Sequence, residues 1–354
     1  MENLNEELKY ILNAFDIKIL PSNPNYWLIR TESGSFYDIF KKNNYVSIGF
    51  DKINIDDIEN LDDKEIKEKI SILYPDYKKP GLVLGQLKNF LYKIENGDII
   101  IIPSKKSRSL CVGQAVSNPY QIKEEIKNKE IKDDILTYKK RIEIKWIAEI
   151  KRNAFDVYIY KLLTSHHGIV SANEYKSFIN RMIFPIYYQN GNIHMCFYIN
   201  KNDNISLNDT FNFYSIIKEA IDIYNATTNS SIKGNISVKS TVNSPGVIEF
   251  LGDPGIMIIV IAVLGICGGK ITANFTKEEK IFEASTDGLL EKILKFVKQS
   301  NRKNLEKSKF NLEEYKLKSE NVLKAMNADI SQRPTIENNI ILVEKNKKNK
   351  KRVN

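Results

Sequence analysis

The sequence predicts a mixed α+β protein with a partly open β-barrel and interposed helices at its N-terminus, followed by a smaller α/β domain. Three observations favour this fold class. Short β-branched and aromatic runs alternate with helical patterns in the first half, a strong hairpin pattern opens the second, and Pro254–Gly269 contains no charge. We therefore expect three regions: a barrel domain at 1–183, an α/β domain at 184–300, and a charged helix with a basic tail at 301–354.

Length, charge and cysteine usage limit the class of protein. With 354 residues, 42% of them hydrophobic, the chain is long enough for about two domains with their own cores. The formal net charge is +9, but Lys345–Arg352 supplies six of these charges and leaves the remainder at +3. Such a run is typical of a solvated chain end, and contact with nucleic acid or anionic lipid is the alternative.

The cysteines and the N-terminus indicate a cytoplasmic protein. Cys111, Cys196 and Cys267 lie far apart in apolar surroundings, which predicts buried thiols in a reducing compartment. The first residues form an acidic, amphipathic pattern rather than a basic stretch followed by an apolar core. We therefore expect no secretory signal.

The predicted barrel domain begins with two strands, Tyr26–Ile29 and Tyr45–Ile48, separated by turn residues and about one helical turn. A helix that ends at Pro75 and a second helical pattern over Leu84–Ile94 follow. Further strands are predicted at Ile99–Ile102, Leu110–Val116 and Arg141–Ile147. Strands with interposed helices are compatible with a partly open barrel.

The second region is predicted from a hairpin whose turn is Gln189–Asn192, between two aromatic and β-branched runs. An amphipathic helix is expected at Phe211–Tyr224 and a strand at Asn235–Ser240. The last helices are expected at Gly288–Val297 and Leu305–Met326.

The apolar segment Pro254–Gly269 has two interpretations. As a helix, its 16 residues would be about 24 Å long, which is shorter than the roughly 30 Å hydrocarbon core of a bilayer. Asp253 and Lys270 limit its extension at either end. The segment is therefore expected to form a buried core helix or strand, with membrane insertion as the alternative because its apolarity exceeds what one buried strand needs.

One stretch has the residue types of a metal-dependent nuclease. Glu143-Ile144-Lys145 lies on a predicted strand, with Asp133 and Asp134 upstream, and such enzymes bind the metal with carboxylates while a lysine stabilises the developing charge. Strand alternation explains the triplet better, because it directs Ile144 inward and the two charged residues toward water. The nuclease interpretation remains as a minor alternative.

No other pattern predicts catalysis or a bound metal. The adjacent His166 and His167 would face opposite sides of an extended chain, and His194 lies apart from any cluster of ligand-type residues. Ser165 beside His166 lacks the orienting third residue of a nucleophilic triad. Gly265–Lys270 is one residue too short for a phosphate-binding loop and lacks its hydroxyl residue. We therefore expect no catalytic residue, metal or cofactor.

The region from Tyr26 to about Ile183 resembles the EVE-like branch of the PUA superfamily, especially the N-terminal domains attached to Mrr-type restriction proteins. The resemblance covers a little under half of the chain. It is carried in order by Tyr26–Arg30, Phe36–Phe40, Val46–Phe50, Gly85–Leu87 with Phe90, Gly97–Ile100, Cys111–Gly113 and Arg141–Trp146. Phe50 departs from the family, which usually has Trp after the Ile-Gly pair.

The resemblance implies a β-barrel whose pocket accepts a flipped, often modified, base between aromatic faces. The expected binding residues are Trp27, Arg30, Ser35, Phe36, Tyr37 and Phe50, with Ser33 in the same loop. For Trp27 and Phe50, the alternative to base binding is that they are ordinary core residues. An inter-strand loop is expected to contact phosphates through Lys105, Lys106 and Arg108, with a solvated loop as its alternative.

The sequence therefore favours a non-enzymatic sensor that binds a modified base in nucleic acid, or a nucleotide, in a prokaryotic defence or restriction-like system. The region after Ile183 does not match the nuclease domain that usually accompanies such readers, so we expect it to signal, to bind a partner protein or to form a homo-oligomer. A membrane-associated effector that inserts Pro254–Gly269 is the alternative.

Overall fold

The computed structural model describes residues 4–122, 138–201, 203–240, 246–266, 292–293, 295–296 and 306–330. The chain forms two compact units. One, the half-barrel unit, spans Asn23–Asn180, and the other, the C-terminal unit, combines Met1–Ser22 with Arg181–Arg333. The expected domain 1–183 thus differs from the half-barrel unit mainly by its first 22 residues.

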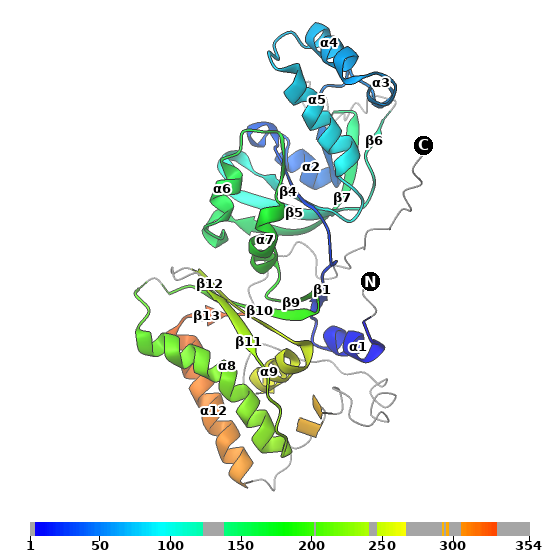
Figure 1. The fold of residues 1–354 in the computed structure, drawn as a ribbon. Coiled ribbons are helices and arrows are strands. Elements are labelled where there is room, and N and C mark those ends of the chain that lie inside the picture. The colour runs from blue at the N-terminus through cyan, green and yellow to red at the C-terminus, as the bar shows by residue number, and fades with distance from the viewer. Residues whose placement is uncertain are drawn as a thin grey trace. The chain divides into compact units, whose positions relative to one another are not determined.

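The half-barrel unit is built on a curled, half-open sheet of seven strands (Figure 1). All neighbouring strands are antiparallel except the pair β2–β4. The order across the sheet is β3 (Tyr45–Ile48), β7 (Lys140–Lys151), β5 (Ser109–Ala115), β4 (Ile99–Pro103), β2 (Tyr26–Ile29) and β8 (Ile169–Ser171), and β6 (Tyr120–Gln121) pairs with β7. The expected mixed α+β class with a partly open barrel is therefore found here.

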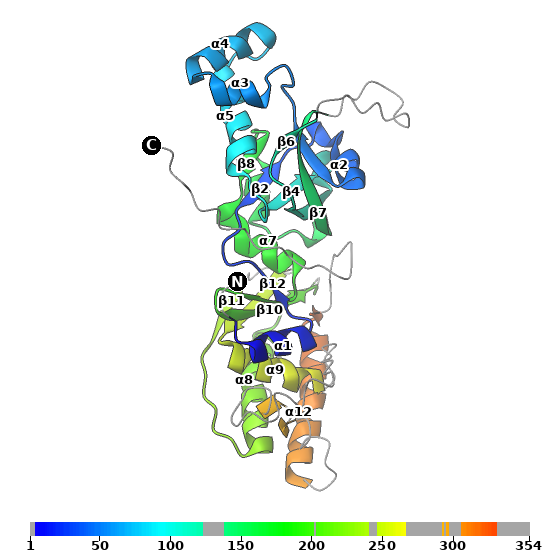
Figure 2. The same cartoon turned by 90° about the vertical axis from the view of Figure 1, so that its right-hand side faces the viewer.

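Helices occupy the connections of this sheet. They are α2 (Tyr37–Asn43), α3 (Ile55–Asn60), α4 (Asp63–Leu73), α5 (Pro80–Lys88) and α6 (Ile159–Leu163), with α7 (Lys176–Ile183) leading into the other unit. Figures 1 and 2 show α3, α4 and α5 together at one end of the half-barrel unit. Two short 3₁₀ turns, η1 (Glu32–Gly34) and η3 (Lys105–Ser107), lie in its loops, and a π-helical turn (Asn89–Lys93) continues α5.

Strand β7 is longer than the predicted Arg141–Ile147 because it continues through a β-bulge. The register against β5 shifts between Val112 and Gly113, and the strand then runs on to Lys151. Gly113 makes the bulge possible, since a Cβ there would lie 2.7 Å from the Trp146 ring. A bulge bends its strand, which suits a curled sheet.

The C-terminal unit contains a second sheet of six strands. Its order is β1 (Lys18–Ile19), β9 (Ile186–Gln189), β10 (Asn192–Ile199), β12 (Gly246–Gly252) and β11 (Ile236–Ser240), with β13 (Ala328–Asp329) paired to β10. The predicted hairpin is confirmed as β9 and β10, joined by Asn190 and Gly191, both with positive φ. The helices of the unit are α1 (Glu6–Ala14), α8 (Leu207–Thr228), α9 (Pro254–Ile266) and α12 (Glu306–Ala325).

The first residues of the chain belong to the C-terminal unit for a packing reason. Helix α1 buries Ile11 and Leu12 in the core of that unit, and Phe15 and Ile17 join the same core. Strand β1 then pairs in parallel with β9. Sequence patterns cannot reveal this pairing, because its two strands are separated by the whole half-barrel unit.

The described part of the apolar segment forms helix α9, Pro254–Ile266, and most of its described side chains are buried in the same core. Met257, Ile258, Val260, Ile261 and Val263 are completely inaccessible to solvent. Helix α8 packs against α9 and also against α12, as Figure 1 shows. Within the part of the chain that the structure describes, no helix combines the length and the apolarity needed to cross a membrane.

Several sequence expectations fall on residues outside the described ranges. These are Asp133, Asp134, Cys267, the Gly268–Lys270 part of the glycine-rich stretch, most of the helix expected at Gly288–Val297, and the basic run Lys345–Arg352. Of the cysteines, Cys111 and Cys196 are buried free thiols, as expected. Burial raises the pKa of the Cys111 thiol to about 12.

The C-terminal unit contains a buried carboxylate whose pKa is shifted. Glu249 is fully buried, and its Oε1 lies 2.5 Å from His194 Nδ1 and accepts a 3.2 Å hydrogen bond from Tyr187. Burial alone would raise the pKa of Glu249, but the hydrogen bond and charge of His194, with Lys239 and Arg181 nearby, outweigh burial and lower this pKa.

We predict that Glu249→Gln flattens the acid dependence of folding. Because the carboxyl pKa is lower in the folded chain, the unfolded chain binds more protons as the pH falls below the ordinary value of 4.5, and the unfolding free energy decreases. Denaturant unfolding measured from pH 7 to pH 3 should show a smaller decrease for this variant than for the wild type. The exposed Glu313→Gln variant serves as the control. An unchanged pH profile in Glu249→Gln would contradict the prediction.

Candidate functional site

The half-barrel unit contains a pocket of about 930 Å³, which lies within the size range of small-molecule and cofactor sites. Its walls come from segments far apart in sequence, including β2, α2, β3, the end of α4 and the loop before β8. Aromatic side chains are prominent among the lining residues: Phe36, Phe40, Phe50, Tyr74, Tyr77 and Tyr138. The pocket therefore offers both flat apolar surfaces and hydroxyl groups.

The aromatic side chains form two groups. In the first, Phe36 stacks on Phe40 with ring centroids 5.6 Å apart and planes 13° from parallel, and Tyr138 lies 5.1 Å from Phe36. In the second, Phe50 meets Tyr74 and Tyr77 edge-on at 5.2 and 5.0 Å. Offset-stacked and edge-on contacts are the favourable arrangements for aromatic pairs, so both groups are stable surfaces.

Phe50 has an unusual backbone conformation. Its φ is +64°, in the left-handed region that a bulky side chain rarely adopts. Strain of this kind costs on the order of 1–3 kcal/mol and persists only where surrounding contacts impose it. The contacts that hold Phe50 are therefore part of the site.

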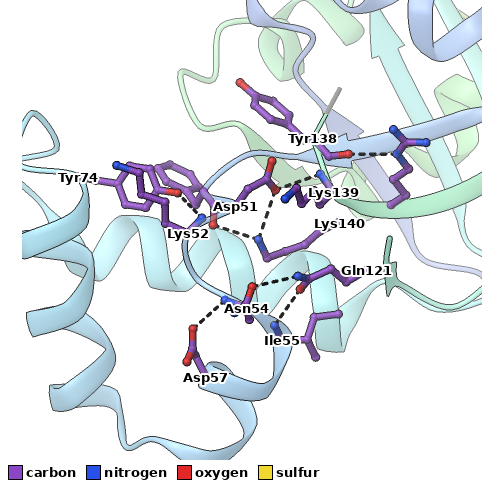
Figure 3. A network of polar contacts seen from close by, with 12 residues as sticks. Asp51, Lys52, Asn54, Ile55, Asp57, Tyr74, Gln121, Tyr138, Lys139 and Lys140 are labelled. Carbon is purple, nitrogen blue, oxygen red and sulfur yellow. Dashed lines mark hydrogen bonds and ion pairs between the residues drawn. The ribbon is translucent and has the colours of Figure 1, made fainter. Parts of the chain in front are cut away.

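A buried lysine supplies those contacts (Figure 3). Lys140 is fully buried, and its Nζ donates a 3.0 Å hydrogen bond to the Phe50 carbonyl and lies 3.6 Å from Asp51 Oδ1. Asp51 also accepts a 3.0 Å hydrogen bond from the Lys139 amide. Burial lowers the pKa of Lys140, whereas Asp51 and Asp57 oppose that shift. Strands β3 and β7 are thus joined at the point where Phe50 turns toward the pocket.

Lys52, in the same loop, contacts Tyr74 at the C-terminal end of α4. The Lys52 amide donates a 2.8 Å hydrogen bond to the Tyr74 hydroxyl, and its ammonium lies 5.7 Å from the centre of the Tyr74 ring. Figure 3 shows Asp51, Lys52, Tyr74 and Lys140 within this network. The two aromatic residues Phe50 and Tyr74 are therefore oriented by one connected set of polar contacts.

Arg30 organises the polar wall of the pocket. Its guanidinium donates hydrogen bonds to the carbonyls of Leu163 and Ser165, and its amide donates a 2.8 Å hydrogen bond to the Gly168 carbonyl. These bonds hold the loop that places His166 on the wall. Burial lowers the pKa of Arg30, but an arginine stays charged. Arg30 is therefore a residue that shapes the pocket through the loop it holds.

Ser47 supplies a polar group without a partner in the wall of the pocket. It is 5% exposed, and its Oγ is shielded from solvent without a hydrogen-bond partner among the described residues. A buried hydroxyl without a partner carries a desolvation cost of about 1–3 kcal/mol. Such a group is a candidate for a hydrogen bond to a ligand.

The structure brings together four of the residues expected at a binding site. Arg30, Ser33, Phe36 and Phe50 all line the pocket. These residues follow or precede the strands β2 and β3, as the sequence suggested. Arg30, however, points its guanidinium at backbone carbonyls.

Three other expected residues lie elsewhere. Trp27 is 6% exposed in the core, and its indole nitrogen donates a 3.1 Å hydrogen bond to the buried Asp98 carboxylate. Tyr37 donates a 2.7 Å hydrogen bond to Glu149, and burial raises its pKa. Ser35 is exposed and does not line the pocket. Trp27 therefore occupies a core position, which was the alternative to a binding role for this residue.

The expected phosphate-contacting loop lies beside the pocket. Lys105, Lys106 and Arg108 are exposed in and after η3. Gly34, with φ +102°, packs so closely on this loop that a Cβ would lie 2.5 Å from the Lys105 Cα. Since Gly34 ends η1, whose first residues line the pocket, the basic loop borders one pocket wall.

Sequence reasoning missed several pocket residues, namely Ser47, Tyr74, Tyr77, Gln86 and Tyr138. Two tyrosines around the predicted helix stop, in Tyr74-Pro75-Asp76-Tyr77, were a usable signal, because aromatic residues at a helix end often pack on a neighbouring element. No pattern in the sequence indicated that this helix end would meet Phe50.

The nuclease triplet has the alternation that the sequence predicts. Ile142, Ile144 and Trp146 are buried on β7, Glu143 is exposed, and Lys145 is partly exposed. Among the residues that the structure describes, no three His, Cys, Asp or Glu side chains are grouped so that they could hold a metal ion.

Comparison with known proteins adds one finding. A family model described as "Domain of unknown function (DUF8426)" matches residues 26–166. The matched region lies within the half-barrel unit and contains all pocket residues except Gly168 and Ile169. No curated protein matches the chain.

We predict that Lys140→Met loosens the Phe50 turn. The Ile53 amide donates a 3.0 Å hydrogen bond to the same Phe50 carbonyl, so its hydrogen exchange reports on this turn. Loss of the Lys140 bond should speed exchange at Ile53 by about tenfold, the equivalent of about 1.4 kcal/mol. Lys139→Met is the matched control, because only its backbone amide binds Asp51. Equal exchange in the two variants would show that Lys140 does not hold the turn.

Proposed function

We propose that the half-barrel unit is a reader of modified bases in nucleic acid, similar in kind to the EVE-like domains of the PUA superfamily. The observation that carries this proposal is the aromatic pocket with Phe50 held in a strained conformation at its edge. No catalytic step is assigned to it.

The chemistry of base recognition matches the pocket walls. A base taken out of its stack needs a flat apolar surface to replace its neighbours and polar groups to pair with its edge. The group of Phe50, Tyr74 and Tyr77 supplies the flat surfaces. Stacking on an aromatic side chain contributes about 1–3 kcal/mol per base.

The polar groups of the pocket supply selectivity. Ser47 lies in the pocket wall, where its hydroxyl has no partner within the described part of the chain. The loop held by Arg30 presents Ser165 and His166. We assign Ser47 to a hydrogen bond with the edge of the base, reached by rotation about its χ1. The C-terminal unit is then the part that signals or assembles after recognition, in a defence or restriction-like system.

We predict that Phe50→Ala abolishes a preference for one modified base. Duplexes that differ only in a single methylated or hydroxymethylated cytosine, or a methylated adenine, are compared for binding to the full chain. Loss of one stacking partner should lower the affinity for the preferred duplex by at least about fivefold. Tyr92→Ala is the control, because Tyr92 is 46% exposed and does not line the pocket.

Two outcomes would contradict the role of Phe50. One is a preference that survives in Phe50→Ala, and the other is an equal loss in Tyr92→Ala. Thermal unfolding of both variants shows whether either change reflects damage to the fold.

A second prediction concerns Ser47→Ala. Because its hydroxyl has no hydrogen-bond partner among the described residues, its removal should leave the unfolding temperature unchanged or slightly higher. Affinity for the preferred duplex should nevertheless fall by about 3- to 10-fold, the range expected for one neutral hydrogen bond. Ser35→Ala, at an exposed serine outside the pocket, should bind as the wild type does. Wild-type affinity in Ser47→Ala would remove Ser47 from the proposed site.

A further inference from the structure

A half-buried glutamine, Gln86, is placed at the aromatic pocket by a glycine of the loop before β8. Gln86 lies on α5 and lines the pocket, whereas Val83, Leu84 and Leu87 of the same helix are buried. Its carboxamide packs on the backbone of Gly168, where an added Cβ would overlap Gln86 Oε1 and lie 3.4 Å from Gln86 Cδ. Gly168 therefore leaves the space that the Gln86 carboxamide occupies.

The loop that carries Gly168 is itself held in place. The Arg30 amide donates a 2.8 Å hydrogen bond to the Gly168 carbonyl, and the Arg30 guanidinium binds the carbonyls of Leu163 and Ser165. The carboxamide of Gln86 therefore rests on backbone that these hydrogen bonds support. A group that is already positioned loses less conformational entropy when it binds a ligand.

The Gln86 carboxamide has unused hydrogen-bonding capacity. Its side chain makes no hydrogen bond with any residue that the structure describes. A carboxamide carries two N–H donors and a carbonyl oxygen with two lone pairs. Gln86 thus adds a donor and an acceptor, side by side, to the single hydroxyl that Ser47 contributes to the pocket wall.

A donor beside an acceptor is the pattern that complements one edge of cytosine or adenine. Each of these bases presents an amino group next to a ring nitrogen, so one carboxamide can accept from the first and donate to the second. Glutamine and asparagine make the same kind of paired contact with adenine in the major groove of DNA. A base that is flipped out of its stack exposes the edge needed for this contact.

The charges of the pocket favour an amino group over a phosphate. Arg30 and Glu32 are the arginine and the carboxylate among the lining residues, which include no lysine or aspartate. The Arg30 guanidinium is used by backbone carbonyls, whereas the Glu32 carboxylate makes no ion pair with the described residues. A carboxylate accepts hydrogen bonds from an amino group and repels an anion. The ligand expected here is therefore an uncharged ring with an amino group.

We propose that Gln86 determines base specificity, because its carboxamide binds the amino group and the neighbouring ring nitrogen of a cytosine or an adenine in the aromatic pocket. The inference rests on the proposed function, since it takes the ligand to be a flipped base. It goes further by naming the edge of the base that is recognised and the residue that recognises it. Gly168 is a positioning residue, which acts through the carboxamide.

The test is a double-mutant cycle between the full chain and the base. Duplexes carry, at one position, a methylated cytosine or adenine, or the same ring without its amino group, namely the methylated pyrimidinone or purine. The ratio of the two affinities should be about 3- to 10-fold higher for the wild type than for Gln86→Met, the range for one neutral hydrogen bond. Weaker pairing eases flipping of the altered ring equally for every variant, so it cancels in this comparison. Equal ratios would overturn the proposal.

Gly168→Ala tests the same contact with the carboxamide still present. The atom that its Cβ would overlap is the end of a flexible side chain, so the fold should tolerate the change while the carboxamide moves. The ratio should fall as it does in Gln86→Met, and the double variant should show no further decrease. A wild-type ratio in Gly168→Ala would contradict the proposed position of the carboxamide.

Asn89→Leu is the matched control. It removes a carboxamide from the π-helical turn that continues α5, outside the pocket, and should keep the wild-type ratio. An equal decrease in Asn89→Leu and Gln86→Met would overturn the role of Gln86. Thermal unfolding of each variant shows whether its fold is intact.

The outcome for Gln86 is separable from that for the pocket. If Phe50→Ala weakens binding of the methylated duplexes but Gln86→Met keeps the wild-type ratio, the base-reading pocket stands and the role of Gln86 is overturned. A ratio lowered by Gln86→Met beside wild-type affinity in Phe50→Ala would support Gln86 and contradict stacking on Phe50. Binding that neither variant changes would contradict both.

Discussion

The position of Phe50 at the aromatic pocket is tied to one buried hydrogen bond, from the ammonium of Lys140 to the backbone carbonyl of Phe50. A charged group without solvent costs free energy unless it is paired, and Asp51 with the Phe50 carbonyl provides that pairing. In return, Phe50 is kept in a left-handed conformation that its side chain disfavours. The Phe50 part of the aromatic surface is therefore held by a polar contact next to it.

Arg30 and the aromatic side chains contribute to the pocket in different ways. Arg30 binds backbone carbonyls and sets the shape of a loop, whereas Phe50, Tyr74 and Tyr77 present the surface that a flat ligand would meet. The exposed basic loop with Lys105, Lys106 and Arg108 lies beside the pocket. In the proposed function, phosphate contacts to this loop contribute affinity, and the pocket contributes discrimination between bases.

Much of the fold was predictable from local patterns, whereas the tertiary connections were not. The strands β2, β3, β4 and β5 and the hairpin β9–β10 follow from alternation and turn residues. Strand β12 was missed, and β1 joins β9 across more than 160 residues of sequence. Such pairings depend on packing between distant segments, which a local pattern does not encode.

Because local patterns do not encode packing between distant segments, only some of the pocket residues could be predicted. Phe36 and Phe50 were predicted from their places beside strands, but Trp27 was expected in the pocket and instead lies in the core with its indole bound to Asp98. The local sequence pattern does not indicate whether an aromatic residue on a strand faces the core or the pocket. Tyr138 and Ser47 carry no signal of their own, because their role arises only where β3 and β7 pair.

Helix α9 lies in the core of the C-terminal unit, which was the first of the two interpretations of the apolar segment. A charge-free stretch of this length left membrane insertion open, and its described side chains instead pack against α8 in the core of the C-terminal unit. A helix that is hydrophobic on all sides is expected to be buried on all sides, and its neighbours supply that environment.

Base reading by the half-barrel unit is tested most directly by the affinity of the full chain for matched duplexes, with and without one modified base, across a salt series. We predict that all affinities decrease as salt rises, while the preference for one modified duplex persists at high salt, because contacts to a base are less sensitive to counterions than contacts to phosphates. Equal affinities for modified and unmodified duplexes at every salt concentration would contradict it.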